Sequence, residues 1–99
     1  MPLSSSQRKF LRAEAHHLDP VILIGKGGVT DALIGAANAA LESHELIKVR
    51  FNDFKDQKQE LVRDIEARTG AELCGLIGHV AIFFRQQRDP DKRKIELPR

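Results

Sequence analysis

The segment over residues 21–44 constrains the fold more than any other part of the sequence, and it reads VILIGKGGVTDALIGAANAALESH. Its first four residues are apolar, as is typical of a short strand buried on both faces. A helix is predicted from about Val29 to His44, because apolar residues recur there at helical spacing: Val29, Ala32, Leu33, Ala36, Ala37, Ala40 and Leu41. Three glycines and one lysine, residues 25–28, lie between strand and helix. This succession indicates an α/β fold.

Helices and strands alternate through the rest of the chain. Helices are predicted near 4–17, 29–44 and 56–69, and strands at 21–24, 46–51, 71–77 and 80–85, the last two joined as a hairpin at Gly78 and His79. The order α-β-α-β-α-β-β predicts an α/β fold, a single compact sandwich with a small four-stranded mixed sheet. The basic tail over 86–99 is expected to be mobile or to add at a sheet edge. We therefore predict one domain over residues 1–99.

The composition is that of an ordinary globular protein, with 41% hydrophobic and 30% charged residues in a chain of 99. The single cysteine, Cys74, excludes a disulfide within the chain and favours a reducing compartment. No apolar run is long enough to cross a membrane, and the N-terminus lacks the apolar core of a secretory signal. We expect a cytoplasmic protein with no membrane partner.

The net charge of +2 is unevenly distributed. Lys and Arg exceed Asp and Glu by four to two in residues 1–30 and by six to three in residues 85–99, whereas the middle of the chain holds six against nine. Basic ends of this kind can mark a surface that faces a polyanion, although an ordinary solvated surface gives the same pattern.

The glycine loop, residues 25–28, suits an anion because it joins a strand to a helix N-terminus. Free backbone N–H groups and the helix dipole attract negative charge there, glycines let a phosphate approach the backbone, and Lys26 adds a full charge. A plain tight turn is the alternative, but one glycine would suffice for it. We expect the phosphate contact to lie at the start of the helix.

Three loop types could bind such a phosphate. The P-loop pattern is absent, because Lys26 stands between glycines and not after them. The dinucleotide pattern G-x-G-x-x-G is half present, with Gly25 and Gly27 in place but Thr30 where the third glycine belongs. The pattern G-x-x-G, typical of loops that hold an RNA backbone, fits residues 25–28. An RNA-binding loop is favoured, and a small-nucleotide site remains the alternative.

Basic residues elsewhere could extend such a site. Arg8, Arg12 and His16 recur at a spacing of four and so lie on one helix face, with Lys9 beside them. Lys48 and Arg50 alternate with apolar residues and so face away from the apolar side of their strand. Phe83 could stack on a base, but a phenylalanine in a strand is more often buried, and we expect it in the core.

The sequence resembles the CRM domain (chloroplast RNA splicing and ribosome maturation), in the single-domain form of the bacterial YhbY-type proteins. The resemblance runs over about residues 3 to 85, through LRAEAHHLDPVILIGKGGVTDALIGAANAALESHELIKVRF and ELVRDIEARTGAELCGLIGHVAIFFR. The signatures I-G-K-G-G-V-T, H-E-L-I-K-V, the T-G turn and G-x-x-A-I-F-F-R occur in the family's order. Together they are far more specific than a lone G-x-x-G.

This resemblance implies an RNA-binding protein, similar in fold to the C-terminal domain of initiation factor three and associated with precursors of the large ribosomal subunit. It places the binding loop at Gly25, Lys26, Gly27 and Gly28, with basic residues nearby. The expected RNA-binding residues are therefore the loop together with Arg8, Lys9, Arg12, Lys48 and Arg50. We expect a monomer whose partner is ribosomal RNA.

No catalytic residue, metal ligand or cofactor is expected. The four histidines and Cys74 show no recognisable ligand spacing, and no serine or cysteine stands in a nucleophile motif. We therefore predict that the protein is not an enzyme and has no small-molecule substrate. Besides the small-nucleotide site, a protein-interaction adaptor on the ribosome remains an alternative.

Overall fold

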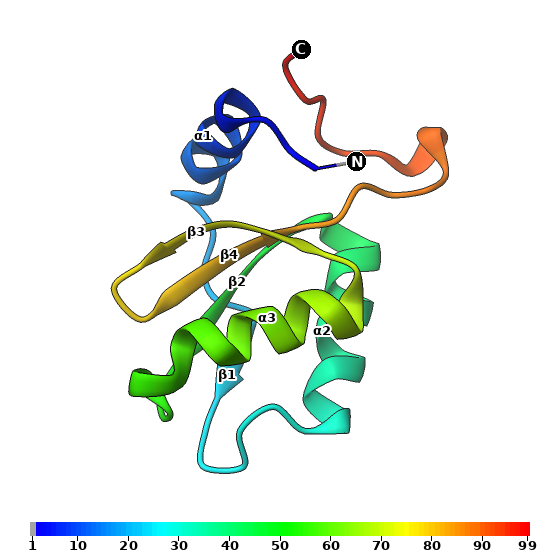
Figure 1. The fold of residues 1–99 in the computed structure, drawn as a ribbon. Helices are drawn as coiled ribbons and strands as arrows, with labels where there is room; N and C mark the ends of the chain where they lie inside the picture. Colours follow the sequence, from blue (N-terminus) through cyan, green and yellow to red (C-terminus); the bar gives the residue numbers. More distant parts are fainter. Residues whose placement is uncertain (1) are drawn as a thin grey trace.

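The fold is described by a computed structural model for residues 2–99 (Figure 1). Three helices and four strands follow one another as predicted, with two short 3₁₀ turns. Their bounds are α1 (Ser5–Ala15), β1 (Ile22–Ile24), α2 (Asp31–His44), β2 (Leu46–Phe51), η1 (Lys55–Gln57), α3 (Lys58–Thr69), β3 (Glu72–Ile77), β4 (Val80–Phe84) and η2 (Pro90–Lys92).

The four strands form one mixed sheet in the order β1-β2-β4-β3. Strand β1 is parallel to β2, and the other neighbours are antiparallel. Helix α1 lies on one face of the sheet, whereas α2 and α3 cover the other (Figure 1). The predicted α/β sandwich with a four-stranded mixed sheet is thus confirmed. None of the described helices is both long and apolar enough to cross a membrane.

The larger core lies between the sheet and helices α2 and α3. Strand β2 contributes alternate residues to it, Ile47, Val49 and Phe51, as its pattern predicts. The inward face of α2 agrees with the prediction at most of its positions, which are Val29, Leu33, Ala37, Ala40 and Leu41. It differs in that Ile34 is buried while Ala32 and Ala36 are exposed. Alanines fit either face of a helix, so their positions alone do not show where the buried face ends.

A smaller core lies under α1, on the other face of the sheet. Leu11 and Ala15 of α1 are fully buried there against Cys74 and Phe84. A capping box fixes the start of α1: the Ser4 hydroxyl accepts from the Gln7 N–H, and the Gln7 side chain accepts from the Ser4 N–H. The helix ends at Ala15, two residues before the predicted end.

The tail over 86–99 does not add a strand at the sheet edge, so that part of the prediction is wrong. It crosses to the α1 side, where Ile95 and Leu97 pack against the smaller core (Figure 1). The fully buried Glu45 explains this path, because its carboxylate accepts hydrogen bonds from the backbone N–H groups of Gln87, Lys94 and Ile95 at 2.7, 2.7 and 3.0 Å. A buried carboxylate with several donors holds a segment firmly.

Candidate nucleic-acid interface

The glycine loop forms an exposed tight turn at the end of β1. The Gly28 N–H donates to the Gly25 carbonyl at 3.0 Å, and the N–H groups of Asn52 and Asp53 fix the preceding Ile24 carbonyl. Gly25, Lys26 and Gly27 are exposed. Within residues 2–99, no acceptor pairs with the Lys26 or Gly27 N–H group. The loop therefore presents two free donors beside a free ammonium group.

Only one glycine of this loop is required by the fold itself. Gly28 has φ +69°, a conformation that side chains disfavour, and a Cβ on it would meet the ring of Phe54 at 3.4 Å. Gly25 and Gly27 have no positive φ, and a Cβ would meet nothing within 4 Å at Gly25 and only a Thr30 methyl at 3.6 Å at Gly27. Neither the turn nor the packing requires glycine at these two positions.

Helix α2 begins two residues later than predicted, at Asp31. The hydroxyl of Thr30 caps it by accepting from the Leu33 N–H at 3.1 Å, and the Asp31 carboxylate pairs with Arg68. The first turn of the helix thus already carries an acceptor and a negative charge. Because Asp31 brings a carboxylate to the helix start, the exposed loop with Lys26 is the more favourable place for an anion, and the phosphate contact stays a prediction.

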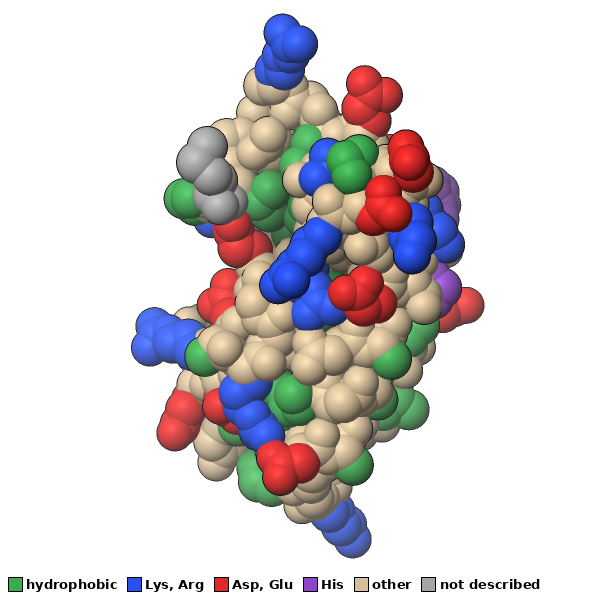
Figure 2. All heavy atoms as spheres, turned by 90° about the vertical axis from the view of Figure 1, so that its right-hand side faces the viewer, with side chains coloured by type: hydrophobic (Ala, Val, Ile, Leu, Met, Phe, Trp, Pro, Cys, Tyr) green, Lys and Arg blue, Asp and Glu red, His purple; other side chains and the backbone are tan. Residues whose placement is uncertain are grey.

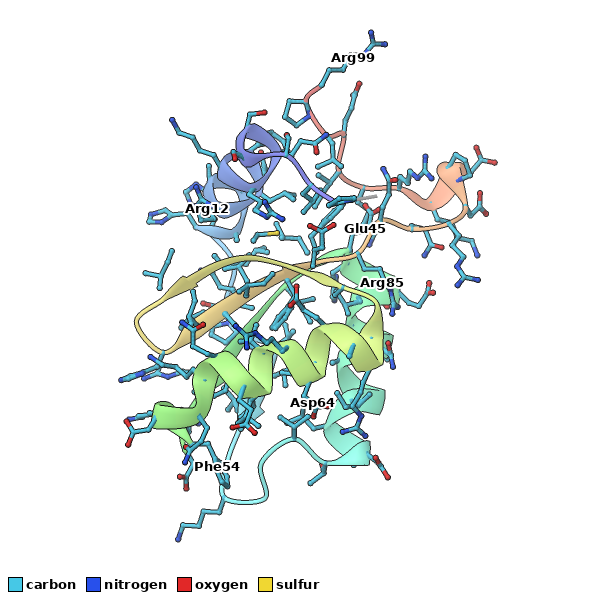
Figure 3. All side chains as sticks on the ribbon, in the orientation of Figure 1. Arg12, Glu45, Phe54, Asp64, Arg85 and Arg99 are labelled. Atoms are coloured by element: carbon cyan, nitrogen blue, oxygen red, sulfur yellow. The ribbon has the colours of Figure 1, made fainter. Side chains whose placement is uncertain are left out.

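An aromatic residue that the sequence did not single out supports the loop. The Phe54 ring lies against Gly28 and is partly buried (Figure 3). Its backbone has φ +55°, a costly conformation for a bulky residue. The Asp53 carboxylate holds it by accepting from the Phe54 N–H at 2.8 Å. The sequence carries no signal for this contact, which arises only when β1 and β2 pair.

Four basic side chains gather where the β3–β4 turn meets the start of α3, and we call them the basic cluster: Arg50, Lys55, Lys58 and His79. The Lys58 ammonium donates to the Gly78 carbonyl at 2.7 Å and lies 3.1 Å from His79 Nδ1. The pKa of His79 is lowered by desolvation and by the charges of Lys58, Lys55 and Arg50. Within residues 2–99 no carboxylate forms an ion pair with any of the four. The sequence prediction had included only Arg50.

The structure places the predicted basic residues in two regions, the glycine loop with Lys26 and the α1 side of the sheet. Figure 3 shows Arg12 on α1 at one end of the molecule and Phe54, beside the glycine loop, at the other. Arg12, Lys48 and Arg50 line one groove on the α1 side of the sheet, so the structure brings these three together. The other two predicted residues of α1, Arg8 and Lys9, do not line this groove.

Several of these cations also have structural contacts. Arg8 pairs with the Glu72 carboxylate at 3.2 Å, which reduces its charge available to RNA. Arg12 donates to the Cys74 carbonyl at 2.8 Å, and the Lys48 ammonium donates to the Leu18 carbonyl at 2.9 Å. Lys9 and Lys26 are exposed, and their ammonium groups have no hydrogen-bonding partner within residues 2–99.

Other parts of the chain offer less to a polyanion. Phe83 is fully buried, as predicted, and cannot stack on a base. Figure 2 shows positive and negative side chains interspersed over the face on the right of Figure 1.

Burial raises the pKa of the Cys74 thiol to about 12. Among residues 2–99, no three His, Cys, Asp or Glu side chains are grouped so that they could hold a metal ion.

Comparison with known proteins identifies the class. The CRS1 / YhbY (CRM) domain matches residues 3–85, and the chain belongs to this family. It is 37% identical over 98 residues to an RNA-binding protein of Haemophilus influenzae, covering 98% of this chain and 96% of that one. It is 34% identical over 97 residues to the "Probable RNA-binding protein YqeI" of Bacillus subtilis, covering 97% and 99%.

A solved structure agrees with this fold. The solution structure of hypothetical protein SAV1595 from Staphylococcus aureus, a protein proposed to bind RNA, is similar with a TM-score of 0.81. The two sequences are 37% identical, and the match covers 98% of this chain and 100% of that one. The names of the Haemophilus influenzae and Bacillus subtilis relatives indicate RNA binding.

Proposed function

We propose that this protein binds structured RNA, with the glycine loop holding one phosphate of the backbone. The Lys26 and Gly27 N–H groups and the Lys26 ammonium are the donors. The RNA-binding names of full-length relatives support the choice of RNA among the possible phosphate ligands. The protein acts by binding alone, as a monomer, and we assign it no catalytic residue, metal or cofactor.

The absence of a structural need for Gly25 and Gly27 is the observation that carries this proposal. Glycine in a loop costs conformational entropy on folding, and Ala would be cheaper where the backbone permits it. Both positions permit a Cβ in the free protein. A Cβ would, however, keep a phosphate from lying directly on the backbone N–H groups. Ligand approach therefore explains two glycines that the fold does not.

Ribosomal RNA of the large subunit, in its precursor form, is the partner that we propose. The family resemblance supports this partner. The basic cluster, together with the cations Arg12, Lys48 and Arg50 around the groove on the α1 side of the sheet, suits a folded RNA with many phosphates. Backbone contacts of this kind position an RNA more than they specify its sequence. We therefore propose recognition by shape, in the cytoplasm, during assembly of the subunit.

The test is to titrate a structured large-subunit rRNA fragment over a salt series with Lys26→Ala. Lys92→Ala is the matched control, since Lys92 is exposed in η2 of the tail, away from the loop. Loss of one phosphate contact should weaken binding about tenfold at low salt and reduce the salt slope by about 0.7–0.9. Equal effects of the two variants would refute the loop as the phosphate site. No binding of wild type to any structured RNA would refute the proposed function itself.

A further inference from the structure

One row of residues across the sheet is not covered by any helix. In the strand register, Leu23 of β1 lies beside Arg50 of β2, Arg50 beside Val80 of β4, and Val80 beside Ile77 of β3. Paired residues point to the same face, so these four form a continuous row on the α1 side, which we call the exposed row. Leu23 and Ile77 are 57% and 62% exposed, although large apolar side chains are usually buried.

Helix α1 stops short of this row and leaves a groove beside it. The next row of the sheet, with Lys48, Ile82 and Gly75, lies under α1, and a Cβ on Gly75 would overlap the Arg12 stem at 2.6 Å. The groove has a volume of about 460 Å³, within the range of ligand sites. Ile77, Val80 and Ile82 contribute apolar surface from the sheet, and Leu18 and Pro20 contribute more from the segment after α1.

The charges around the groove favour one kind of occupant. Arg12, Lys48 and Arg50, with His16, stand around it, against the single carboxylate of Asp19. Arg12 and Lys48 are held in place by the Cys74 and Leu18 carbonyls, and each keeps further N–H donors. An apolar surface bordered by fixed cations suits a flat ring joined to phosphates, as in a nucleotide. It does not suit an acidic protein surface, which would leave the apolar row without a partner.

The exposed row also continues directly into the glycine loop. Leu23 is two residues before Gly25 in β1 and the turn that follows. Four strands about 4.8 Å apart make the row roughly 14 Å long, enough for one or two base faces. An RNA strand whose phosphate lies on the loop therefore has its neighbouring nucleotide within reach of the row.

We propose that the exposed row binds an unpaired nucleotide of the RNA, whose base lies on Ile77, Val80 and the Arg50 guanidinium while its phosphates contact Arg12 and Lys48. This inference rests on the proposed function and deepens it. The preferred RNA has an unpaired nucleotide beside a helix, because a base inside a duplex has no free face. Arg guanidinium planes and apolar surfaces are suited to such stacking.

The test compares two RNA hairpins of identical stem, one fully paired and one with a single unpaired 2-aminopurine nucleotide. The variant is Ile77→Thr with Val80→Thr, which removes the apolar surface of the row where it lines the groove and keeps strand propensity. Val21→Thr is the control, since Val21 is 50% exposed, precedes β1 and does not line this groove. Circular dichroism melting checks the fold of each variant.

Wild type should prefer the hairpin with the unpaired nucleotide by about tenfold and change its 2-aminopurine fluorescence on binding. The double variant should lose both effects while its affinity for the paired hairpin and its salt slope stay at the wild-type values. Retention of the preference in a folded double variant would overturn the proposal. So would self-association of wild type that this variant abolishes, because the row would then be an interface between copies.

The two proposals fail separately in this experiment. If Lys26→Ala weakens binding to both hairpins but the double variant keeps the preference, only the exposed row is excluded. If wild type binds neither hairpin nor the rRNA fragment, the proposed function is refuted, and the inference with it.

Discussion

Glu45 offers the most quantitative test of how the structure is held together. It is a charged residue with 1% exposure and φ +63°, two features that each cost free energy. The carboxylate offsets these costs by accepting hydrogen bonds from three backbone N–H groups of the tail. Oε2 accepts from Gln87, and Oε1 accepts from Lys94 and Ile95. We therefore perturb it with Glu45→Gln, which keeps the size of the side chain.

The magnitude follows from these contacts. A carboxamide has one oxygen, so at least one tail N–H loses its acceptor and faces an NH₂ group, and the remaining bonds lose the assistance of the charge. Hydrogen bonds to charged groups contribute about 1.5–3 kcal/mol each. The total cost is limited, because a released tail can hydrogen-bond to water. We therefore expect Glu45→Gln to lower the free energy of unfolding by about 3 kcal/mol. For a domain of this size, that lowers Tm by roughly 12–24 °C.

Circular dichroism melting measures this effect, because the chain has no Trp or Tyr for fluorescence. Amide hydrogen exchange should also show lost protection at Gln87, Lys94 and Ile95. Glu42→Gln is the matched control, since the exposed Glu42 carboxylate contacts Arg85 and the Gln87 side chain at the surface, and its loss should cost less than about 1 kcal/mol. If Glu45→Gln melts like this control, the carboxylate does not hold the tail and the reasoning is refuted.

Three further predictions follow from other residues. A phosphate near the basic cluster should raise the lowered pKa of His79, so RNA binding takes up a proton there and becomes stronger as pH falls. His79→Gln should flatten this pH dependence of the RNA affinity. An imidazole NMR titration of His79 that RNA leaves unchanged would contradict the prediction. Native Cys74, with a pKa of about 12, should react with a thiol reagent at pH 8 only upon unfolding, and rapid native labelling would show that it is accessible. Gly35→Ala should stabilise the exposed interior of α2 by about 0.8–1 kcal/mol in chemical denaturation, and destabilisation would contradict the free space at this position.

The elements of the fold could be predicted because local pattern and tertiary packing agree. The alternation in β2 gave its buried face, and Gly70 ends α3 with φ +74°, as a glycine after a helix indicates. The start of α2 was predicted too early, although Thr30 followed by Asp31 is a readable capping signal. The apolar spacing extends back to Val29, two residues before the helix begins, and so does not mark its start.

The path of the tail could not be predicted in the same way. Nothing local in the sequence marks Glu45 as buried, since a glutamate after a helix is ordinarily exposed. Its role depends on donors more than forty residues later in the chain. Ile95 and Leu97 were the available signal, two apolar residues in a charged tail, and they pack on the smaller core.

The candidate site was predictable in its loop and less so in its surroundings. Residues 25–28 follow from composition, since three glycines around a lysine are conspicuous in any sequence. Phe54, Lys55 and Lys58 come from segments that the sequence presents as a polar loop and the start of a helix, and only the fold places them near the glycine loop and His79. The exposed row likewise depends on strand order, which no single strand reveals.

The central claim, that Gly25 and Gly27 serve a ligand and not the fold, is tested most directly by replacing both with alanine. We would measure Tm and affinity for the structured rRNA fragment side by side, with Gly35→Ala as the control glycine substitution. The structure predicts an unchanged or slightly raised stability, by about 0.4–1 kcal/mol for each alanine, together with a clear loss of RNA affinity that Gly35→Ala does not share. An alanine variant that folds and binds RNA as wild type does would contradict the claim.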